Sequence, residues 1–482
     1  MLLQDLVAAA PEATLQDAAQ LDITDIVMDS RKVTPGCLFV CLVGHASDGH
    51  AYAAQAVEAG AAALLVQRPV EAAGGVPQVV APDTRRAWAQ MCAAFYGYPA
   101  RKLRLVGVTG TNGKTTTATL IKGVLEFAGY KVGMMGTVAN YVGQEKLPQS
   151  LTTPDPMELH ALLRRMADAG CDFAVMEVSA HALALHKVEG LVYDVAVFTN
   201  LTQDHLDDFQ TMEKYASAKA LLFQDDCCRC AVVNGEDPAT ERMIAAFHGP
   251  VVRYGQSPAC GVRALERQES LQGLRYVLLA MGSQMPVRLQ LGGAFNVYNS
   301  LAAAGACLQL GLSMRMVAEG LAQVPCVDGR IQRVETGTDY TVIVDYAHSP
   351  DGLKSILESL RPQTAGRLIC VFGCGGDRDR TKRPIMGDIA TTLADLVFLT
   401  SDNPRTEDPD AILDMIEQGV NREGAPIRRL ADRAAAIGAA LDEAAPGDVV
   451  LIAGKGHETY QDVMGVKHHF DDREVVQQHL GR

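Results

Sequence analysis

The sequence lacks the features that mark membrane-spanning and secreted proteins. No apolar run among its 482 residues reaches the roughly 18 residues of a membrane span. The first residues carry neither the basic segment nor the hydrophobic core of a secretion signal. Internal repeats and low-complexity stretches are also absent from the sequence. With 48% hydrophobic and 21% charged residues, the chain is predicted to be a soluble globular protein.

The sequence also has little positive charge. Its formal net charge of −14 argues against nucleic acid as the main partner, because neutralising backbone phosphates needs a basic face. Anionic small molecules would instead need local basic pockets. We expect small-molecule partners, no nucleic acid, no membrane span and a monomeric protein.

The twelve cysteines follow no disulfide-framework spacing. Cys41, Cys171 and Cys370 fall within predicted core strands, which suits a reducing compartment. The three cysteines at 227–230 lack a second pair at zinc-ligand spacing, which disfavours a zinc site. The cysteine usage therefore predicts a cytoplasmic location.

The length predicts about three domains of the α/β class. Residues 1–98 form a small α/β unit, whose pattern breaks at 96–99. Residues 99–328 alternate helices with apolar strands, as expected of a mostly parallel sheet covered on both faces. A new cycle at 329–482 predicts a Rossmann-like, doubly wound domain. The expected strands lie at 36–42, 173–178, 195–199, 231–233, 341–345, 368–372, 396–399 and 449–453, and the expected helices at 51–59, 115–127 and 215–223.

A glycine turn between a β-branched run and a helix is the most informative motif. Gly110 and Gly113 let the backbone turn tightly, so that its N–H groups and the positive end of the following helix face phosphate oxygens. Lys114 would reach the transferred phosphoryl group, and the Thr115 hydroxyl would hold Mg²⁺. The usual phosphate loop has glycine where Val108 stands, so this is a shortened variant. The motif predicts a nucleotide-phosphate site.

Two polar side chains follow neighbouring strands at the edge where a parallel sheet binds ligands. Glu177 ends one strand, and His205 comes shortly after the next. Alone, each could be a solvent-exposed or structural residue; together they favour a metal site. Lys219 lies among small and apolar residues in a predicted helix, where it could simply extend its ammonium to solvent.

Four motifs follow one another along the chain: Gly-Thr-Asn-Gly-Lys-Thr-Thr at 110–116, Glu-Val-Ser at 177–179, Asn-Leu-x-x-Asp-His-Leu-Asp at 200–207 and Tyr-x-x-Ala-Lys-x-x-Leu-Phe at 215–223. In these motifs and their order the chain resembles the Mur ligases, the ATP-dependent amino-acid-adding enzymes of peptidoglycan precursor synthesis. The resemblance covers essentially the whole chain. It implies that Lys219 is carbamylated and that this carbamate ligates Mg²⁺ together with Thr115, Glu177 and His205.

The resemblance also implies an ATP site that the third domain completes with Arg330 and Asp345, and a UDP-sugar peptide site in the first two domains. The implied ATP-binding residues are Gly110, Thr111, Asn112, Gly113, Lys114, Thr115, Thr116, Asn296, Asn299, Arg330 and Asp345. The implied contacts to a UDP-sugar peptide are Ser30, His45, Ala46, Ser47, Thr152, Thr153, Ser179 and Lys187. The sequence departs from the family pattern at Leu151, Ala180, Leu185 and Lys187, where asparagine, serine, a polar residue and arginine are frequent.

The run Asp402-Asn403-Pro404-Arg405 is similar to the signature of the family members that add meso-diaminopimelate. Arg378, Gly454 and Glu458 match the remaining amino-acid contacts of that group. A guanidinium reads the distal carboxylate of diaminopimelate bidentately, and a carboxylate such as that of Glu458 reads its ammonium. A plain capped turn is the structural alternative for the run.

The resemblance implies an acyl-phosphate mechanism in cell-wall synthesis, which supports cell shape and division. ATP would phosphorylate the D-glutamyl α-carboxylate of a UDP-N-acetylmuramoyl dipeptide, and the diaminopimelate amine would attack. Closure of the third domain would exclude water. One alternative is a folylpolyglutamate synthase-like ligase, which gives no reason for Asp402–Arg405 or for Asp29-Ser30-Arg31. Another is a regulatory NTPase, against which the guanine-reading Asn-Lys-x-Asp motif is missing.

Overall fold

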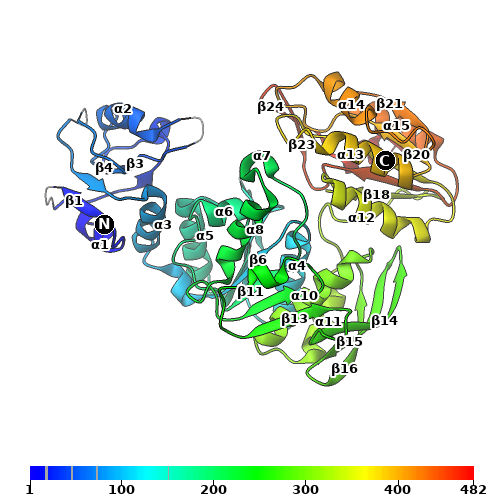
Figure 1. Cartoon of the computed structure of the whole chain (residues 1–482), viewed down its shortest axis with the longest axis horizontal. Helices are drawn as coiled ribbons and strands as arrows, with labels where there is room; N and C mark the ends of the chain where they lie inside the picture. The colour runs from blue at the N-terminus through cyan, green and yellow to red at the C-terminus, as the bar shows by residue number, and fades with distance from the viewer. Residues whose placement is uncertain (17–19, 45–46, 72–73, 150, 482) are drawn as a thin grey trace.

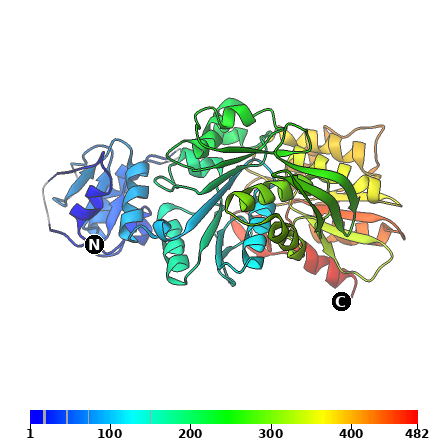
Figure 2. The ribbon, with the colours of Figure 1, turned by 90° about the horizontal axis from the view of Figure 1, so that it is seen from below.

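The computed structural model describes residues 1–16, 20–44, 47–71, 74–149 and 151–481. The chain forms three lobes in sequence order, each built around its own sheet (Figure 1). The lobes lie in a row, with the N-terminal lobe at one end and the C-terminal lobe at the other (Figure 2). The expectation of an α/β protein with three sheet-containing units is confirmed.

The first lobe has a five-stranded sheet in the order β1-β5-β4-β3-β2, in which β1 is the antiparallel edge strand. Its elements are α1 (Leu3–Ala8), β1 (Thr14–Gln16), β2 (Ile26–Val27), η1 (Ser30–Lys32), β3 (Leu38–Val40), η2 (Gly49–Tyr52), α2 (Ala53–Glu58), β4 (Ala63–Val66), β5 (Gln78–Val80) and α3 (Thr84–Phe95). Strand β3 is shorter than the expected 36–42, because Gly36 turns the chain with a φ of 86° and its N–H donates to Gly60 instead of a neighbouring strand.

The central lobe has an eleven-stranded sheet in the order β16-β15-β14-β13-β12-β11-β6-β10-β7-β8-β9. Pairing is parallel from β14 to β7 and antiparallel in the two flanking hairpin regions. Its elements are η3 (Pro99–Lys102), β6 (Arg104–Thr109), α4 (Lys114–Phe127), β7 (Val132–Met135), β8 (Asn140–Val142), β9 (Glu145–Leu147), α5 (Pro156–Asp168), β10 (Phe173–Glu177), α6 (Ala180–Ala184), β11 (Val195–Phe198), α7 (Leu206–Phe209), α8 (Met212–Ala220), η4 (Leu221–Phe223), β12 (Ala231–Asn234), α9 (Thr240–Met243), β13 (Val251–Gly255), β14 (Val262–Ser270), β15 (Gly273–Ala280), β16 (Ser283–Leu289), α10 (Phe295–Gln309) and α11 (Met314–Gln323).

Alternation along β6 explains why both faces of the central sheet are covered. Val106 and Val108 pack with α4, α10 and α11 on one face, whereas Leu105 packs with α5 on the other. Successive side chains of a strand point to opposite faces, so a continuous apolar run must be buried on both sides. The register aligns Val108 with Glu177 and Thr109 with Phe198, which brings three carboxyl ends together at one edge.

The third lobe has a six-stranded sheet in the order β17-β18-β22-β19-β20-β21, parallel except for β17. Helices α12 to α14 cover one face, while α15 and α16 cover the other. Its elements are β17 (Gln332–Val334), β18 (Thr341–Asp345), α12 (Pro350–Leu360), η5 (Arg361–Gln363), β19 (Leu368–Phe372), α13 (Lys382–Leu393), β20 (Leu396–Leu399), α14 (Pro409–Glu417), β21 (Ile427–Arg429), α15 (Arg433–Glu443), β22 (Val449–Ala453), β23 (Tyr460–Val463), β24 (Val466–His469) and α16 (Asp472–His479).

The four strands expected in the third lobe have the bounds that the sequence predicted, and the arrangement is doubly wound. The helix expected at 215–223 is α8 followed by the 3₁₀ turn η4, and the helix expected at 115–127 begins one residue earlier. The β14–β16 meander and the β8–β9 and β23–β24 hairpins were not predicted from the sequence. Within the described ranges, every helix is too short or too polar to cross a membrane.

Candidate active site

The glycine turn joins β6 to α4 in a conformation that only glycine adopts without strain. Gly110 has a φ of 149° and Gly113 a φ of 85°. A Cβ atom at Gly110 would collide with Thr199 Oγ1, and one at Gly113 with Asn299 Oδ1. The N–H groups of Thr111 and Asn112 donate at 2.9 Å to the backbone and side-chain oxygens of Asn200. Strand β11 therefore fixes the turn through the residues that follow it.

Lys114 folds back over this turn. Its Nζ donates to the carbonyl oxygens of Gly110 at 2.9 Å and Thr111 at 2.8 Å. Desolvation lowers the pKa of Lys114, and the charge of Glu177 opposes that shift. The ammonium lies at the start of α4, beside the carbonyls of the predicted phosphate loop.

Glu177 is fully buried, which rules out the solvent-exposed alternative. Its carboxylate accepts hydrogen bonds from Thr115 Oγ1 at 3.0 Å, from Thr137 Oγ1 at 2.9 Å and from the Thr137 N–H at 2.8 Å. Thr115 and Glu177 thus form a cluster of hard oxygen atoms next to the glycine turn. Thr137 is a member of this cluster that the sequence analysis missed, because a lone threonine outside the motifs gave no signal.

Lys219 is 1% exposed, which rules out an ammonium extended to solvent. Its Nζ donates to the Gly110 carbonyl at 2.9 Å and lies 4.3 Å from the centre of the Tyr215 ring. Burial, and secondarily the charge of Lys114, holds the pKa of Lys219 well below its ordinary value. A neutral, nucleophilic amine is the form that this environment favours.

His205 lies beside Tyr215 and His181 rather than in contact with Glu177. Its ring centre is 6.0 Å from that of Tyr215 and 5.0 Å from that of His181. Burial lowers the pKa of His205 to about 4, so its imidazole is neutral at neutral pH. Ligand atoms of His181, His205 and Asp208 lie within 4.8 Å of one another.

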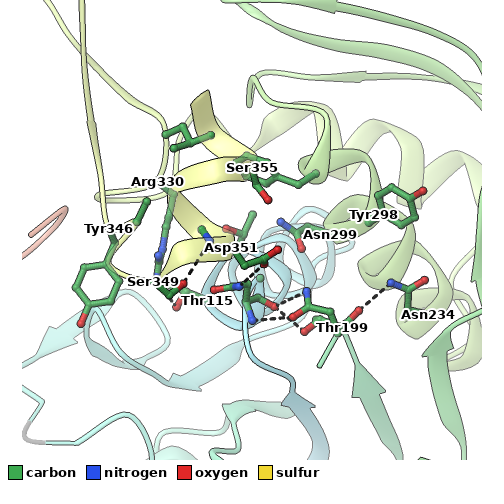
Figure 3. Close-up of a pocket in the computed structure, with 18 of the residues that line it drawn as sticks. Thr115, Thr199, Asn234, Tyr298, Asn299, Arg330, Tyr346, Ser349, Asp351 and Ser355 are labelled. Atoms are coloured by element: carbon green, nitrogen blue, oxygen red, sulfur yellow. Dashed lines mark hydrogen bonds between the residues drawn. The ribbon is translucent and has the colours of Figure 1, made fainter. Parts of the chain in front are cut away.

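A cavity of about 360 Å³ opens between the glycine turn and the third lobe (Figure 3). Most of the ATP residues implied by the sequence line it, namely Asn112, Gly113, Thr115, Thr116, Asn299, Arg330 and Asp345. Asn296 lies behind them, and its side-chain oxygen accepts a hydrogen bond at 2.8 Å from Asn299 Nδ2. The cavity also holds Asn234, Glu236, Asp237, Tyr298 and Ser355, which the sequence analysis did not single out.

Two contacts cross the cavity from the third lobe to the glycine turn. Asn112 Nδ2 donates to Asp351 Oδ2 at 2.9 Å, and Arg330 Nη2 lies 3.4 Å from Thr115 Oγ1. Arg330 Cζ also lies 4.6 Å from the centre of the Tyr346 ring. Figure 3 shows the two side chains next to each other. Asp345 accepts backbone N–H bonds on both oxygens, and burial raises its pKa. The third lobe is therefore already in contact with the phosphate loop.

The residues implied for the UDP-sugar peptide divide between the first and central lobes. Ser30 and Ser47 lie in the first lobe, while His45 and Ala46 fall outside the described residues. Thr152, Thr153 and Ser179 cluster at the carboxyl end of β10, where Thr153 Oγ1 donates to the Glu177 carbonyl at 2.8 Å. Lys187 pairs with Asp155 at 2.7 Å.

The residues around Asp402, Asn403 and Pro404 are buried and form more than a capped turn. Asn403 Nδ2 donates to Glu458 Oε2 at 2.8 Å, which joins the loop after β20 to the loop after β22. Gly454, with a φ of 118°, closes against Asp402, whose Oδ2 leaves no room for a Cβ.

The two arginines of this region differ in exposure. Arg405 is half-buried and donates from Nη1 to the Gly376 carbonyl at 2.7 Å. Arg378 is exposed and donates to the Asp377 carbonyl at 3.0 Å. Both lie at the carboxyl edge of the third sheet, on the loops after β19 and β20.

Lys455 is a buried residue of this region to which the sequence analysis gave no role. It is 0% exposed, and its Nζ lies 3.1 Å from both Asn403 Oδ1 and Glu458 Oε2. The available signal was a lysine between two glycines at the end of an apolar strand, where a ligand-binding edge is expected.

Comparison with protein families finds three Mur ligase domains in order along the chain. The catalytic domain of the Mur ligase family matches residues 22–96, the Mur ligase middle domain residues 108–307, and the glutamate ligase domain residues 329–456. These matches follow the three sheets.

Relatives match over the full length. The UDP-N-acetylmuramoyl-L-alanyl-D-glutamate–2,6-diaminopimelate ligase of Geobacillus thermodenitrificans is 45% identical, covering 99% of this chain and 98% of the relative. A solved structure of a ligase of that name is 34% identical with a TM-score of 0.69, covering 97% of this chain and 96% of that one. A folylpolyglutamate synthase of Mycobacterium tuberculosis has a TM-score of 0.64 at 20% identity, covering 83% of this chain and 95% of that one, which shows a shared fold.

The residues of the glycine turn, the buried carboxylate beside it and the full-length similarity to named ligases agree with one another. A switch-type NTPase is not supported, because the matched proteins are ligases along their whole length. The chain belongs to the Mur ligase family of ATP-dependent ligases.

Proposed function

We propose that this enzyme joins meso-diaminopimelate to UDP-N-acetylmuramoyl-L-alanyl-D-glutamate during peptidoglycan precursor synthesis, converting ATP to ADP and phosphate. One observation carries the proposal: a relative named for this reaction is 45% identical over 99% of the chain. The buried loop around Asn403 and Glu458 supports the choice of amino acid, because it joins the two motifs expected to contact that substrate.

The reaction needs no protein nucleophile. The D-glutamyl α-carboxylate attacks the γ-phosphorus of ATP, giving an acyl phosphate and ADP. The neutral diaminopimelate amine then adds to the acyl carbon; phosphate leaves and the nitrogen releases one proton to solvent as the amide forms. Lys114 stabilises the charge of the transferring phosphoryl group, and the N–H groups of the glycine turn orient the phosphates.

Mg²⁺ fits the oxygen cluster beside the glycine turn. Thr115 Oγ1 and Glu177 Oε2 lie 3.0 Å apart, and hydroxyl and carboxylate oxygens are the ligands that Mg²⁺ prefers. We assign Thr115, Glu177, His205 and the Lys219 carbamate to hold this cation, which would neutralise charge on the phosphates.

Lys219 would acquire its carbamate by reaction with carbon dioxide. The neutral amine forms an N–C bond to the carbon of CO₂ and releases one proton to solvent, which leaves an anion. Burial of Lys219 beneath the Gly110 carbonyl supports this reaction, because it favours the uncharged amine.

The substrate sites follow the three lobes. ATP would occupy the cavity beside Asn299 and Arg330, and the UDP-sugar peptide would extend from there toward Ser30 in the first lobe. Diaminopimelate would meet Arg378, Asp402–Arg405, Gly454 and Glu458 in the third. Domain boundaries at 98/99 and 328/329 leave every sheet intact.

The setting of the enzyme is proposed on the same basis. We expect a monomer in the cytoplasm, where the nucleotide substrates are made. All twelve cysteines are free thiols, which suits a reducing compartment.

Phosphate release with defined substrates tests the proposal. We expect release only when ATP, Mg²⁺, the UDP-sugar dipeptide and meso-diaminopimelate are all present, with L-lysine a poor substitute. Release with a folate substrate and glutamate would favour the folylpolyglutamate synthase-like alternative. Release without any acceptor would overturn ligation altogether.

A further inference from the structure

The carboxylate of Glu458 is held by one of its two oxygens. Asn403 Nδ2 donates to Oε2 at 2.8 Å, and Lys455 Nζ lies 3.1 Å from the same atom. In the described part of the chain, no hydrogen bond reaches Oε1. The side chain of Glu458 is 16% exposed, so the free oxygen is the one available to a ligand.

The side chain of Asn403 is hydrogen-bonded within the same network. Its Oδ1 accepts from Lys455 Nζ at 3.1 Å and from the Asp462 N–H at 2.9 Å, while its Nδ2 is bound to Glu458. Asn403 is 3% exposed. Its amide therefore holds Glu458 in place, and the Asp462 N–H of strand β23 holds the amide in turn.

Lys455 is the one charged member of this network without access to solvent. A fully buried ammonium is stable only when its charge and its N–H groups are satisfied, which Glu458 and Asn403 do here. The network is thus a buried cation behind the carboxylate that is expected to face the substrate.

We propose that Lys455 is a positioning and specificity-determining residue for the amino-acid substrate, an inference that rests on the function proposed above. Its ammonium fixes Glu458 so that Oε1 alone faces the ligand. It also disfavours a substrate that ends in a bare ammonium.

The selectivity follows from the charges at the distal ends of the two amino acids, diaminopimelate and L-lysine. The distal end of diaminopimelate carries an ammonium and a carboxylate on one carbon, so repulsion of the first by Lys455 is offset by attraction of the second. L-Lysine offers an ammonium alone and meets the repulsion without compensation. In a poorly solvated site such charge effects fall off slowly with distance, so a cation behind the carboxylate still acts on the ligand.

The test removes the charge of Lys455 and keeps a side chain of similar size. Lys455→Met removes charge and hydrogen bonds, and Lys455→Gln keeps a donor without the charge. Lys467→Met is the matched control, because Lys467 contacts the same Tyr460 ring at 4.1 Å from the exposed side of the hairpin. Initial rates are measured with meso-diaminopimelate and with L-lysine, at varied ATP and varied dipeptide, and thermal unfolding establishes that each variant folds.

We expect both Lys455 variants to raise the KM for diaminopimelate about tenfold, with kcat and the KM values for ATP and dipeptide changed less than twofold. The kcat/KM ratio of diaminopimelate to L-lysine should fall at least about fivefold, and Lys467→Met should match the wild type. Equal losses for all substrates, an unchanged ratio, or failure of both variants to fold would overturn the inference. If the wild type does not use diaminopimelate, the proposed function falls and the inference with it; a wild type that does, with unchanged selectivity in the variants, overturns the inference alone.

Discussion

Among the described residues, Lys219 and Lys455 are the two lysines that are at most 1% exposed, one at each ligand-binding edge, and their surroundings differ in one respect. Lys455, in the third lobe, is paired with the carboxylate of Glu458 at 3.1 Å. Lys219, in the central lobe, meets a carbonyl and an aromatic ring, and among the described residues no carboxylate lies within ion-pair distance of it. Both side chains are at most 1% exposed.

The comparison shows that the partner, and not burial alone, decides what a buried lysine is suited to do. Burial, together with the charge of Lys114, holds the pKa of Lys219 well below its ordinary value, and the opposing charge of Asp204 does not offset these effects. Such an amine is free to react. Lys455 is instead paired with the carboxylate of Glu458, which holds its side chain in a fixed position. The following predictions test whether these and other buried groups have the chemical roles that their surroundings suggest.

The largest effect is expected at Lys219. Lys219→Ala should lower phosphate release by roughly a thousandfold, because the site loses an anion that helps to hold the cation. Lys219→Glu should recover part of this loss by supplying a carboxylate of similar reach. Lys214→Ala, on the exposed face of the same helix α8, is the control and should be nearly unaffected.

Activity of Lys219→Ala near that of the wild type would contradict the carbamate. So would a crystal structure of the Mg²⁺-bound enzyme in which the Lys219 amine is unmodified.

Lys114→Ala should reduce acyl-phosphate formation by more than about a hundredfold, as expected when one major electrostatic stabiliser of a transition state is removed. Binding of the UDP-sugar dipeptide should persist, because its implied contacts lie mainly elsewhere. Calorimetry measures the binding and phosphate release measures the chemistry. Lys122→Ala, in the same helix α4, is the control. Loss of dipeptide binding together with activity would assign Lys114 to holding the loop together instead.

The sequence predicted the parts of the site that are contiguous. Gly110, Lys114 and Thr115 form one motif, and the strands that precede the functional loops are continuous apolar runs, which is why their bounds were recovered in the third lobe. Burial of Glu177 and Lys219 needed the structure, because burial depends on helices and strands that lie far away in the sequence.

The contacts made between motifs were beyond the reach of sequence patterns. Asp351 contacts Asn112 across a separation of 239 residues, and Lys455 contacts Asn403, 52 positions earlier. Both residues lie within a few positions of residues that the sequence analysis named, yet their partners are set by how two lobes and two loops meet. The same holds for the flanking hairpins, whose strands are partly exposed and lack a continuous apolar run.

Arg405→Ala should weaken diaminopimelate selectively. Loss of a bidentate contact to the distal carboxylate typically costs a few kcal/mol, on the order of a hundredfold in kcat/KM. The kcat/KM values for ATP and the dipeptide should barely change, and the kcat/KM ratio of diaminopimelate to L-lysine should fall. Arg428→Ala, an exposed arginine of the same lobe, is the control.

The structure sharpens this prediction, because Arg405 also donates at 2.7 Å to the Gly376 carbonyl of the neighbouring loop. If all three substrates weaken together in steady-state kinetics, Arg405 holds the two loops together and does not select the amino acid.

The smallest effect on catalysis is expected from His160, a buried base. It is 1% exposed in α5, neither ring nitrogen has a hydrogen-bond partner in the described part of the chain, and burial lowers its pKa from 6.5 to about 4. The folded state thus binds the proton more weakly than the unfolded state. The free energy of unfolding is therefore unaffected by protonation of His160 above pH 6.5. It decreases as the pH falls from 6.5 toward 4, by about 3 kcal/mol at most.

Urea unfolding at several pH values should show this decrease in the wild type and in His468→Gln, whose histidine is exposed, and a shallower one in His160→Leu. Parallel pH profiles for His160→Leu and the wild type would mean that an unpartnered buried base is protonated as readily as an exposed one, which is the opposite of what Lys219 requires.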